Sequence, residues 1–313
     1  MREIVVFSGS AHPALSAEIC AHLGVPPRPV RLTRFANDCL EVQLLANCRE
    51  RDVFVIQPLG PPVQENLVEL LLMLDAARGA SAARVTAVIP YYAYARSDKK
   101  SMPRISIGGR LVADLVATAG ATRVLAMTLH APQVHGFFSV PVDHLHALRE
   151  FATHFAPLDL SNFVVVSPDL GNAKNAAALA RMLQLPVAAG AKERHSDQSV
   201  TISSIIGDVA GRDVIVLDDE IARGTTVLEL LDRLGERDVR SVRIACTHGL
   251  FADNALMRIA AHRLVREIVC TNTLPVAVGD GAELRVISIA PALAEAIRRI
   301  HEGESVSALF GAG

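Results

Sequence analysis

The chain has 313 residues, half of them hydrophobic, which is enough to bury two α/β cores of about 150 residues each. Its formal net charge is −2, from 31 basic and 33 acidic residues, so no global field would draw it to nucleic acid or to an anionic membrane surface. Any attraction for a phosphate ligand must therefore be local.

The cysteine pattern predicts a reducing compartment. The five cysteines are odd in number and form no C-x-x-C pair, which argues against a disulfide framework and against a structural zinc site. The first residues lack the apolar region of a signal peptide, and the longest apolar run, Leu67 to Leu74, is interrupted by Glu69. We expect a soluble cytoplasmic protein that binds neither membrane nor nucleic acid.

Short runs of β-branched residues alternate with amphipathic patterns along the chain. The runs predict strands that are buried on both faces at Ile4–Phe7, Val53–Ile56, Val85–Ile89, Val124–Met127, Val164–Val166, Val214–Leu217 and Val242–Cys246. The patterns between them predict helices at Ala14–Leu23, Asn66–Ala77, Ile107–Ala119, Ala173–Leu183 and Thr226–Leu234. This alternation is typical of an α/β protein with a mainly parallel, doubly wound sheet.

Three of these segments recur at a nearly constant distance. VVFS from Val5 returns as VVVS from Val164, DVFVI from Asp52 as DVIVL from Asp213, and VEL from Val68 as LEL from Leu228, at offsets of 159, 161 and 160 residues. Buried strands use few residue types, so chance likeness is the alternative, but a constant offset over three segments favours an internal duplication. We therefore predict two similar domains, 1–147 and 148–313, with the boundary just after the polar stretch Asp143–His146.

The main concentration of polar residues follows the predicted strand Val214–Leu217. Asp218 and Asp219 lie where ligands bind in open α/β sheets, and the following turn opens a helix with Gly224, Thr225 and Thr226. Such a turn offers backbone N–H groups, hydroxyls and the positive end of a helix to a phosphate, while the carboxylates can face sugar hydroxyls or a metal ion. The alternative is a polar turn with threonine caps, which leaves two adjacent acids unexplained.

Two further residues end predicted strands. Asp169, in Ser-Pro-Asp-Leu-Gly-Asn, is a candidate Mg²⁺ ligand or equally an N-cap. His130, in Thr-Leu-His-Ala, is a candidate functional residue because of its neighbours, although lone histidines are usually structural.

Two basic segments could face a polyphosphate. Lys192 and Arg194 follow a short strand predicted around Pro186–Ala188 and could stabilise charge on a transferring phosphoryl group, with a solvated loop as the alternative. The stretch from Tyr91 to Arg104 begins with aromatic residues and becomes strongly basic, as a mobile flap over a polyphosphate would.

These motifs also carry a resemblance to a known family. VLDDEIARGTT resembles the ribose 5-phosphate signature of the phosphoribosyltransferase fold. In order along almost the whole chain, YARSDKK, TLHAPQVHGFFSVPVDHL, SPDLGN, AKER, SIIGDVAGRDVIVLDD, ACTHGLF and IRRIHEGESVSALF resemble the ribose-phosphate pyrophosphokinases.

The resemblance implies two tandem phosphoribosyltransferase-like domains, with the last helix packed back on the first domain. It implies Mg²⁺-dependent transfer of the ATP diphosphate to C1 of ribose 5-phosphate, giving phosphoribosyl diphosphate and AMP. It also implies a homo-oligomer, a hexamer or a dimer-based assembly, in which subunits share the ATP site.

The same resemblance assigns roles to individual residues. Lys192 and Arg194 would stabilise the diphosphate during transfer, and His130 and Asp169 would be metal ligands. ATP would be bound by Phe35, Asn37, Arg96, Ser97, Asp98 and Lys99, with Phe35 and Asn37 reaching a neighbouring subunit. Ribose 5-phosphate would be bound by Asp218, Asp219, Ala222, Arg223, Gly224, Thr225 and Thr226.

The chain departs from the family pattern at several positions. Ala222-Arg223 replaces the usual Asp-Thr, Asn37-Asp38-Cys39 replaces Asp-Gly-Glu, Asn175 replaces an Arg and Ser97 replaces a Gln. Two other functions remain as alternatives, namely a catalytically silent paralogue that regulates active subunits and a phosphoribosyltransferase. The retained Lys192, Arg194, His130 and Asp169 argue against the first, and the duplicated half with its flap argues against the second.

Overall fold

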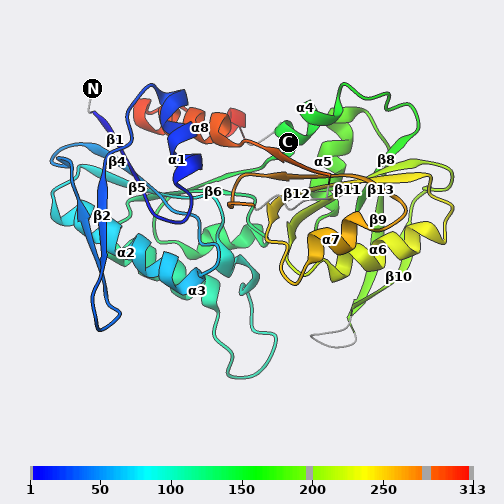
Figure 1. Ribbon diagram of the computed structural model, residues 1–313, viewed down its shortest axis with the longest axis horizontal. Coiled ribbons are helices and arrows are strands. Elements are labelled where there is room, and N and C mark those ends of the chain that lie inside the picture. The colour runs from blue at the N-terminus through cyan, green and yellow to red at the C-terminus, as the bar shows by residue number, and fades with distance from the viewer. Residues whose placement is uncertain (1–2, 195–199, 277–282, 310–313) are drawn as a thin grey trace. The chain divides into compact units, whose positions relative to one another are not determined.

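The chain forms two compact units, which are described separately here. The computed structural model describes residues 3–194, 200–276 and 283–309, with the backbone alone for 192–194, 200–201 and 308. Unit 1 comprises Met1–His146, Thr273–Pro275 and Ser288–Ala312, and unit 2 comprises Ala147–Asn272 and Val276–Ile287 (Figure 1).

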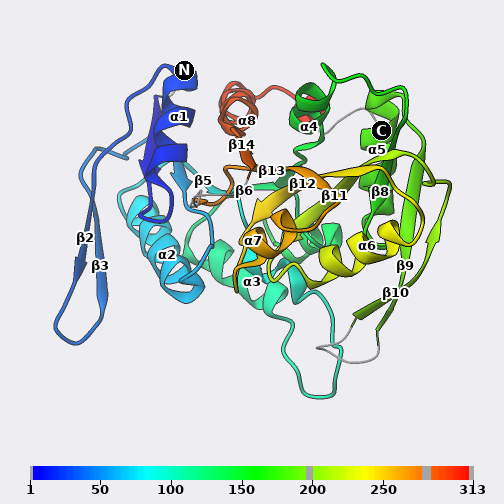
Figure 2. The same ribbon diagram turned by 45° about the vertical axis from the view of Figure 1, so that its right-hand side comes forward.

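Unit 1 is built on five parallel strands in the order β1-β4-β5-β6-β7. The strands are β1 (Ile4–Ser8), β4 (Asp52–Ile56), β5 (Arg84–Ile89), β6 (Arg123–Met127) and β7 (Val142–Leu145), and an antiparallel hairpin is formed by β2 (Val30–Arg34) and β3 (Leu40–Leu44). Helices α1 (Pro13–Leu23) and α8 (Ala290–Glu302) cover one face of the sheet, and α2 (Val63–Gly79) and α3 (Gly108–Ala119) cover the other (Figures 1 and 2). Short 3₁₀ helices are η1 (Ala93–Arg96), η2 (Pro132–Phe137) and η3 (Ser307–Leu309).

Unit 2 has a seven-stranded sheet in the order β10-β9-β8-β11-β12-β13-β14, in which only the β9–β10 pair is antiparallel among the described strands. The strands are β8 (Phe163–Ser167), β9 (Val187–Arg194), β10 (Val200–Ile206), β11 (Asp213–Ile221), β12 (Ser241–Gly249), β13 (Val265–Thr271) and β14 (Leu284–Ile287). Helices α4 (Leu148–Phe155) and α5 (Ala173–Leu183) cover one face, and α6 (Thr225–Gly235) and α7 (Ala255–Ala260) cover the other (Figure 1). Within the described ranges, none of the helices combines the length and the hydropathy of a membrane span.

The two units repeat one strand order. Strands β1, β4, β5, β6 and β7 correspond in sequence and in space to β8, β11, β12, β13 and β14. Each unit also has a hairpin after the helix that follows the first strand of its sheet, β2–β3 after α1 in unit 1 and β9–β10 after α5 in unit 2. This is the arrangement that an internal duplication predicts, and the predicted fold class of two mainly parallel α/β sheets is confirmed.

Two predicted strand ends were wrong. The strand expected around Pro186–Ala188 extends to Arg194, so Lys192 lies in β9 and not in a loop after it. The strand expected at Val214–Leu217 extends to Ile221 because β12 pairs with it along its whole length, and both Asp218 and Asp219 therefore belong to β11. Tertiary pairing, which the local pattern does not encode, adds these residues.

A buried aspartate begins the second core strand of each unit. Asp52 in β4 is fully buried and accepts hydrogen bonds from Arg84 Nε at 3.1 Å and from His301 Nδ1 at 2.8 Å. Arg84 also donates to the carbonyl oxygens of Ile300 and His301, so the end of α8 is fixed to the start of β4 and β5. In unit 2, Asp213 takes the corresponding place and is bonded by the side chains of Arg240 and Ser241.

We predict that Asp52→Ala lowers the free energy of unfolding by about 3 kcal/mol. This is the lower end of the cost of breaking a buried ion pair, because Arg84 keeps some contact with water. The measurement is urea unfolding followed by circular dichroism. Asp75→Ala, which removes an exposed partner of Arg78, is the control and should cost less than about 1 kcal/mol. Equal small losses in both variants would contradict the anchoring role of Asp52.

Candidate active site

The carboxyl edge of the unit 2 sheet brings the loop after β8 next to the end of β11. β8 pairs with β11 only as far as Val216, whereas β11 continues with β12 to Ile221. The Asn172 side chain closes the resulting gap by donating to the Leu217 carbonyl oxygen at 2.9 Å. Asn175, the residue that replaces the family's arginine, donates to Asn172 Oδ1 at 2.8 Å and so holds this tether in place.

Asp169 lies at the start of the same loop. Its Oδ1 accepts from the backbone N–H groups of Gly171 at 2.9 Å and Asn172 at 3.2 Å, so the loop is folded around this carboxylate. Gly190 in β9 permits the close approach of the neighbouring strand, since a Cβ there would lie 2.6 Å from the Pro168 carbonyl oxygen. Asp169 therefore stabilises the loop, whereas the N-cap residue of α5 is Asn172, so the N-cap alternative for Asp169 was wrong. The role of Asp169 as a metal ligand stays a prediction.

Asp218 is electrostatically strained. Desolvation by the surrounding protein, together with the carboxylates of Asp219 and Asp169, raises the pKa of Asp218 well above its ordinary value. The Asp219 backbone N–H donates to Asp218 Oδ1 at 2.9 Å and offsets only part of this effect. A site of this kind favours hydrogen-bond donors or a cation beside Asp218, as sugar hydroxyls or a divalent metal would be.

The phosphate-loop segment Ala222–Gly224 leads directly into α6. Gly224 is the N-cap residue, with a left-handed φ of 71°, and no side chain caps the first turn of the helix. A Cβ at Gly224 would lie 2.9 Å from Ile259 of α7, so glycine is required both by the backbone conformation and by the packing. The first-turn N–H groups are thus directed away from the helix with the positive end of its dipole, as a phosphate requires.

The backbone of Lys192 and Arg194 lies at the end of β9, paired with β10. Their side chains are outside the described part of the structure, so their predicted catalytic role stays a prediction. β9 is the neighbour of β8 in the sheet, which places this stretch of backbone on the side of the sheet where the Asp169 loop begins.

In unit 1, the residues predicted to bind ATP follow β5. Arg96 ends η1 and is exposed, and Ser97 Oγ accepts a 2.8 Å hydrogen bond from the Gly108 N–H at the start of α3. Asp98 accepts from Gln133 Nε2 of η2 at 2.6 Å. These bonds fix the two ends of an exposed loop that contains Lys99, so the stretch predicted as a flap has a rigid base in unit 1.

His130 is an exposed residue in the short segment between β6 and η2. Because β5 and β6 are neighbours in the parallel sheet, His130 lies at the same sheet edge as the loop that begins at Arg96. Asp169 belongs to unit 2, so the two candidate metal ligands lie in different units, and their predicted role stays a prediction.

Phe35 and Asn37 lie in the turn of the β2–β3 hairpin. Phe35 is about half exposed, and the turn is closed by a 2.9 Å hydrogen bond from its N–H to the Cys39 carbonyl oxygen. Asn37 Oδ1 accepts from the Cys39 N–H at 3.2 Å, so it stabilises this turn. Figure 2 shows the hairpin extending beyond the sheet of unit 1, which leaves its tip accessible to another molecule.

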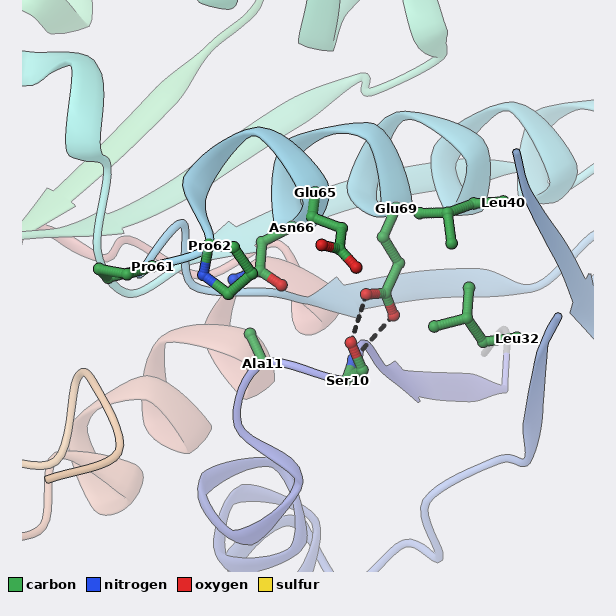
Figure 3. A pocket seen from close by; sticks show the side chains of 9 residues that line it. All are labelled: Ser10, Ala11, Leu32, Leu40, Pro61, Pro62, Glu65, Asn66 and Glu69. Atoms are coloured by element: carbon green, nitrogen blue, oxygen red, sulfur yellow. Dashed lines mark hydrogen bonds between the residues drawn. The ribbon is translucent and has the colours of Figure 1, made fainter. Parts of the chain in front are cut away.

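Unit 1 contains a counterpart of the unit 2 sheet edge, and it forms a pocket of about 250 Å³ (Figure 3). The loop after β1 corresponds to the Asp169 loop, and the loop after β4 corresponds to the phosphate loop. The pocket is lined by Ser10, Ala11, Leu32, Leu40, Pro61, Pro62, Glu65, Asn66 and Glu69.

In this counterpart, a carboxylate of the chain itself accepts the hydrogen bonds that a bound anion would accept. Glu69 of α2 is 3% exposed and accepts from the Ser10 N–H at 2.8 Å and from the Ser10 hydroxyl at 2.5 Å (Figure 3). It also accepts from Gln57 Nε2 at 3.0 Å. Glu229, its sequence counterpart in unit 2, pairs instead with Arg233 on its own helix. A carboxylate therefore already occupies the loop in unit 1, and the corresponding loop in unit 2 begins with the carboxylate of Asp169.

The candidate ligands are of a kind that can bind Mg²⁺. Within the described ranges, no three His, Cys, Asp or Glu side chains are grouped as a complete metal site. Mg²⁺ is usually held by one or two carboxylates with substrate phosphates and water and not by a full protein cage, so isolated oxygen ligands such as Asp169 suit it.

Comparison with known proteins agrees with this geometry. Residues 4–120 match the N-terminal domain of ribose phosphate pyrophosphokinase, and residues 201–311 match the phosphoribosyl synthetase-associated domain. The chain is 48% identical over 312 residues to a ribose-phosphate pyrophosphokinase of Deinococcus radiodurans, covering 98% of each chain. The chain belongs to the ribose-phosphate pyrophosphokinase family.

Other relatives support this assignment. A Streptomyces coelicolor protein provisionally named ribose-phosphate pyrophosphokinase is 72% identical over all 313 residues and is covered to 99%. The crystal structure of the phosphoribosylpyrophosphate synthetase of Mycobacterium smegmatis superimposes with a TM-score of 0.89 at 38% identity, over 96% of this chain and 100% of that one. The predicted family and its diphosphate-transferring class are confirmed, as is the tandem phosphoribosyltransferase-like fold.

Sequence reasoning missed residues that position the site without facing a ligand. Asn172 ends the SPDLGN motif, but nothing in the sequence indicates that its side chain joins the loop after β8 to β11. The role of Glu69 was also missed, although its place in the repeated VEL and LEL segments could have marked it for comparison with Glu229.

The raised pKa of Asp218 yields a prediction on stability. The folded protein binds the Asp218 proton more tightly than the unfolded chain does. Stability from this group is therefore complete below the unfolded pKa of about 3.9 and is lost as the pH rises through the higher folded pKa. Asp218→Asn cannot ionise and should be more stable than wild type at pH 8 without divalent metal, and about equal at pH 4.

Urea unfolding at pH 4, 6 and 8 measures this difference. Asp208→Asn is the control, because Asp208 is an exposed carboxylate paired with Arg212 in the same unit and should show no gain at pH 8. A loss of stability in Asp218→Asn at pH 8 would show that Asp218 is not electrostatically unfavourable in the free protein.

Proposed function

We propose that the chain is a Mg²⁺-dependent ribose-phosphate diphosphokinase that forms phosphoribosyl diphosphate and AMP from ribose 5-phosphate and ATP. The anomeric oxygen of the sugar attacks the β-phosphorus of ATP. The bond between that phosphorus and the oxygen bridging to the α-phosphorus breaks, AMP leaves with this oxygen, and the anomeric proton passes to solvent. Such a transfer depends on positioning and charge neutralisation more than on covalent catalysis.

The observation that carries the proposal is the charge gradient along one short segment of unit 2. Asp218 and Asp219 lie in the last part of β11, and the uncapped N-terminus of α6 follows within a few residues. Ribose 5-phosphate has a matching polarity, with hydroxyl donors on the ring and a dianion at C5. The sugar hydroxyls would bind Asp218 and Asp219, and residues 222–226 would bind the phosphate.

ATP would be bound from unit 1. Arg96 and Lys99 are exposed cations in and beside the loop that follows η1. The hydrogen bond between Ser97 and Gly108 joins the two ends of this loop, and the one between Asp98 and Gln133 fixes its start, as a closing flap requires. Lys192 and Arg194 would stabilise the negative charge that develops on the transferring diphosphate.

His130 and Asp169 would each be a metal ligand, and oxygens of the substrates would supply further ligands. Bound Mg²⁺ neutralises phosphate charge and polarises the phosphorus that is attacked. The chain's own contribution is to present Asp169 in a loop that its backbone hydrogen bonds fix, so that the carboxylate does not have to be ordered at each turnover.

The assembly would be a cytoplasmic homo-oligomer, a hexamer or a dimer-based form, with the ATP site shared between subunits. An exposed aromatic side chain in the turn of the β2–β3 hairpin supports this arrangement, because an exposed ring such as that of Phe35 would stack on the adenine bound by another subunit.

The reaction type is tested by its products. With ATP, ribose 5-phosphate and Mg²⁺, the purified protein should form AMP and phosphoribosyl diphosphate in equal amounts and no ADP. Omitting the sugar phosphate or chelating the metal should abolish AMP formation. Stoichiometric ADP would refute diphosphate transfer, and no turnover with intact binding of both substrates would instead indicate a regulatory paralogue.

The shared site is tested by mixing two impaired proteins. Phe35→Ala and Lys192→Ala should each lower activity at subsaturating ATP, Lys192→Ala mainly through kcat and by on the order of a hundredfold. After subunit exchange, sites that combine one intact Phe35 with one intact Lys192 should restore up to about a quarter of wild-type activity. The control mixes two differently tagged Phe35→Ala preparations, which proves exchange. Demonstrated exchange without recovery would place both residues in the site of a single subunit.

A further inference from the structure

Arg223 forms an ion pair that the family pattern does not anticipate. It directly precedes the N-cap of α6, and its Nε lies 3.0 Å from Asp253 Oδ2. Both side chains are largely in water, with exposed fractions of 74% for Arg223 and 65% for Asp253. An ion pair so exposed contributes little to stability and is easily exchanged for another partner.

The loop that carries Asp253 is firmly placed beside the phosphate loop. The N–H groups of Leu250 and Phe251 both donate to the Ile221 carbonyl oxygen at 3.1 Å, at the end of β11. Phe251, Asp253 and Asn254 all have left-handed φ values, between 47° and 57°, which non-glycine residues adopt only when their surroundings impose it.

Contacts of the phosphate loop complete this arrangement. A Cβ at Gly224 would lie 2.9 Å from Ile259 and 3.3 Å from Ala255, so the phosphate loop packs closely on the helix that follows Asp253. The Asp253 carboxylate is therefore fixed by a short side chain on a constrained backbone. Arg223 is long, and its guanidinium can turn about a fixed Cα.

A phosphate bound at α6 would compete with Asp253 for Arg223. The first turn of α6 contains no acidic residue and no side-chain cap, so it favours an anion. A phosphate dianion carries more charge than a carboxylate and accepts two parallel hydrogen bonds from a guanidinium. Arg223 is adjacent to both partners, and the dianion is the stronger one.

We propose that Arg223 is a switching specificity residue for the sugar phosphate, held by Asp253 in the free protein and transferred to the 5-phosphate when the substrate binds. This deepens the proposed function and rests on it. Asp253 then opposes binding, because part of the affinity of Arg223 is used to break the ion pair. The substitution of Ala222-Arg223 for the usual Asp-Thr thus replaces an acidic residue by an adjustable cation.

The test is a double-mutant cycle on Arg223→Ala, Asp253→Asn and the double variant. The KM for ribose 5-phosphate should rise about tenfold in Arg223→Ala, as expected for one charge-assisted hydrogen bond. It should fall about two- to fivefold in Asp253→Asn, and the double variant should behave like Arg223→Ala. The KM for ATP and kcat should stay within about twofold.

Matched controls lie in the same unit. Asp232→Asn removes an exposed, paired carboxylate from α6, and Arg258→Ala removes an exposed arginine from α7, and both should leave the KM for ribose 5-phosphate unchanged. Calorimetric titration of ribose 5-phosphate into each variant gives the same comparison without turnover.

Each outcome separates the two claims. An unchanged or raised KM in Asp253→Asn, with the native circular dichroism spectrum retained, overturns the switch, as does an unchanged KM in Arg223→Ala. These results leave the proposed function intact if the wild type forms AMP and phosphoribosyl diphosphate. A wild type that binds ribose 5-phosphate in the calorimeter and forms neither product refutes the proposed function while the binding cycle still reports on the switch.

Discussion

The parallel register of β8, β11 and β12 is the constraint on which the candidate site depends. β11 pairs with β12 as far as Ile221 but with β8 only as far as Val216. The last residues of β11 therefore have a paired strand on one side only. Asn172 satisfies the Leu217 carbonyl on the other side, which allows a polar strand end without an unpaired backbone group. The same hydrogen bond fixes the loop that contains Asp169 beside the end of β11, where the Asp169 charge contributes to the raised pKa of Asp218.

The two units have corresponding sheet edges, which differ in where their acidic side chains lie. In unit 1 the strand β4 stops at Ile56, and the acid beside this edge, Glu69, stands on helix α2. There the carboxylate is consumed by Ser10 and Gln57 inside the fold, where it serves stability. In unit 2, Asp218 and Asp219 stand on the strand itself, and burial together with the charges of Asp219 and Asp169 raises the pKa of Asp218.

Sequence patterns predicted the parallel core because buried strands of β-branched residues are local signals. Eight predicted strands correspond to β1, β4, β5, β6, β8, β9, β11 and β12. The strands β2, β3, β7, β10, β13 and β14 were not predicted, and several of them, such as the half-exposed β2 and β3, lack a continuous apolar run. Their pairing comes from tertiary contacts, as does the extension of β11 past Leu217.

The candidate site was predictable where the residue types and their spacing themselves indicate a chemistry. Asp218 and the Gly-Thr-Thr turn carry chemistry in their own types and spacing, so the sequence identified them. Asn172 and Asp253 act through other residues, across 45 and 30 positions of the chain, and their partners, Leu217 and Arg223, are known only from the fold. No local pattern reports such a pairing.

Charge explains how a chain with a net charge of −2 can bind a dianion. Asp169, Asp218 and Asp219 would repel phosphate, but they lie in or after the strands β8 and β11. The α6 N-terminus and Arg223 lie further along the chain, at the start of the helix. The electrostatic field of the α6 N-terminus falls off within about one turn, so it acts only on the part of a ligand that lies next to it. In the proposed function this fixes the direction of the sugar, with its phosphate at α6 and its ring hydroxyls at Asp218. Recognition then follows from a steep local gradient, and the overall charge of the protein has little influence on it.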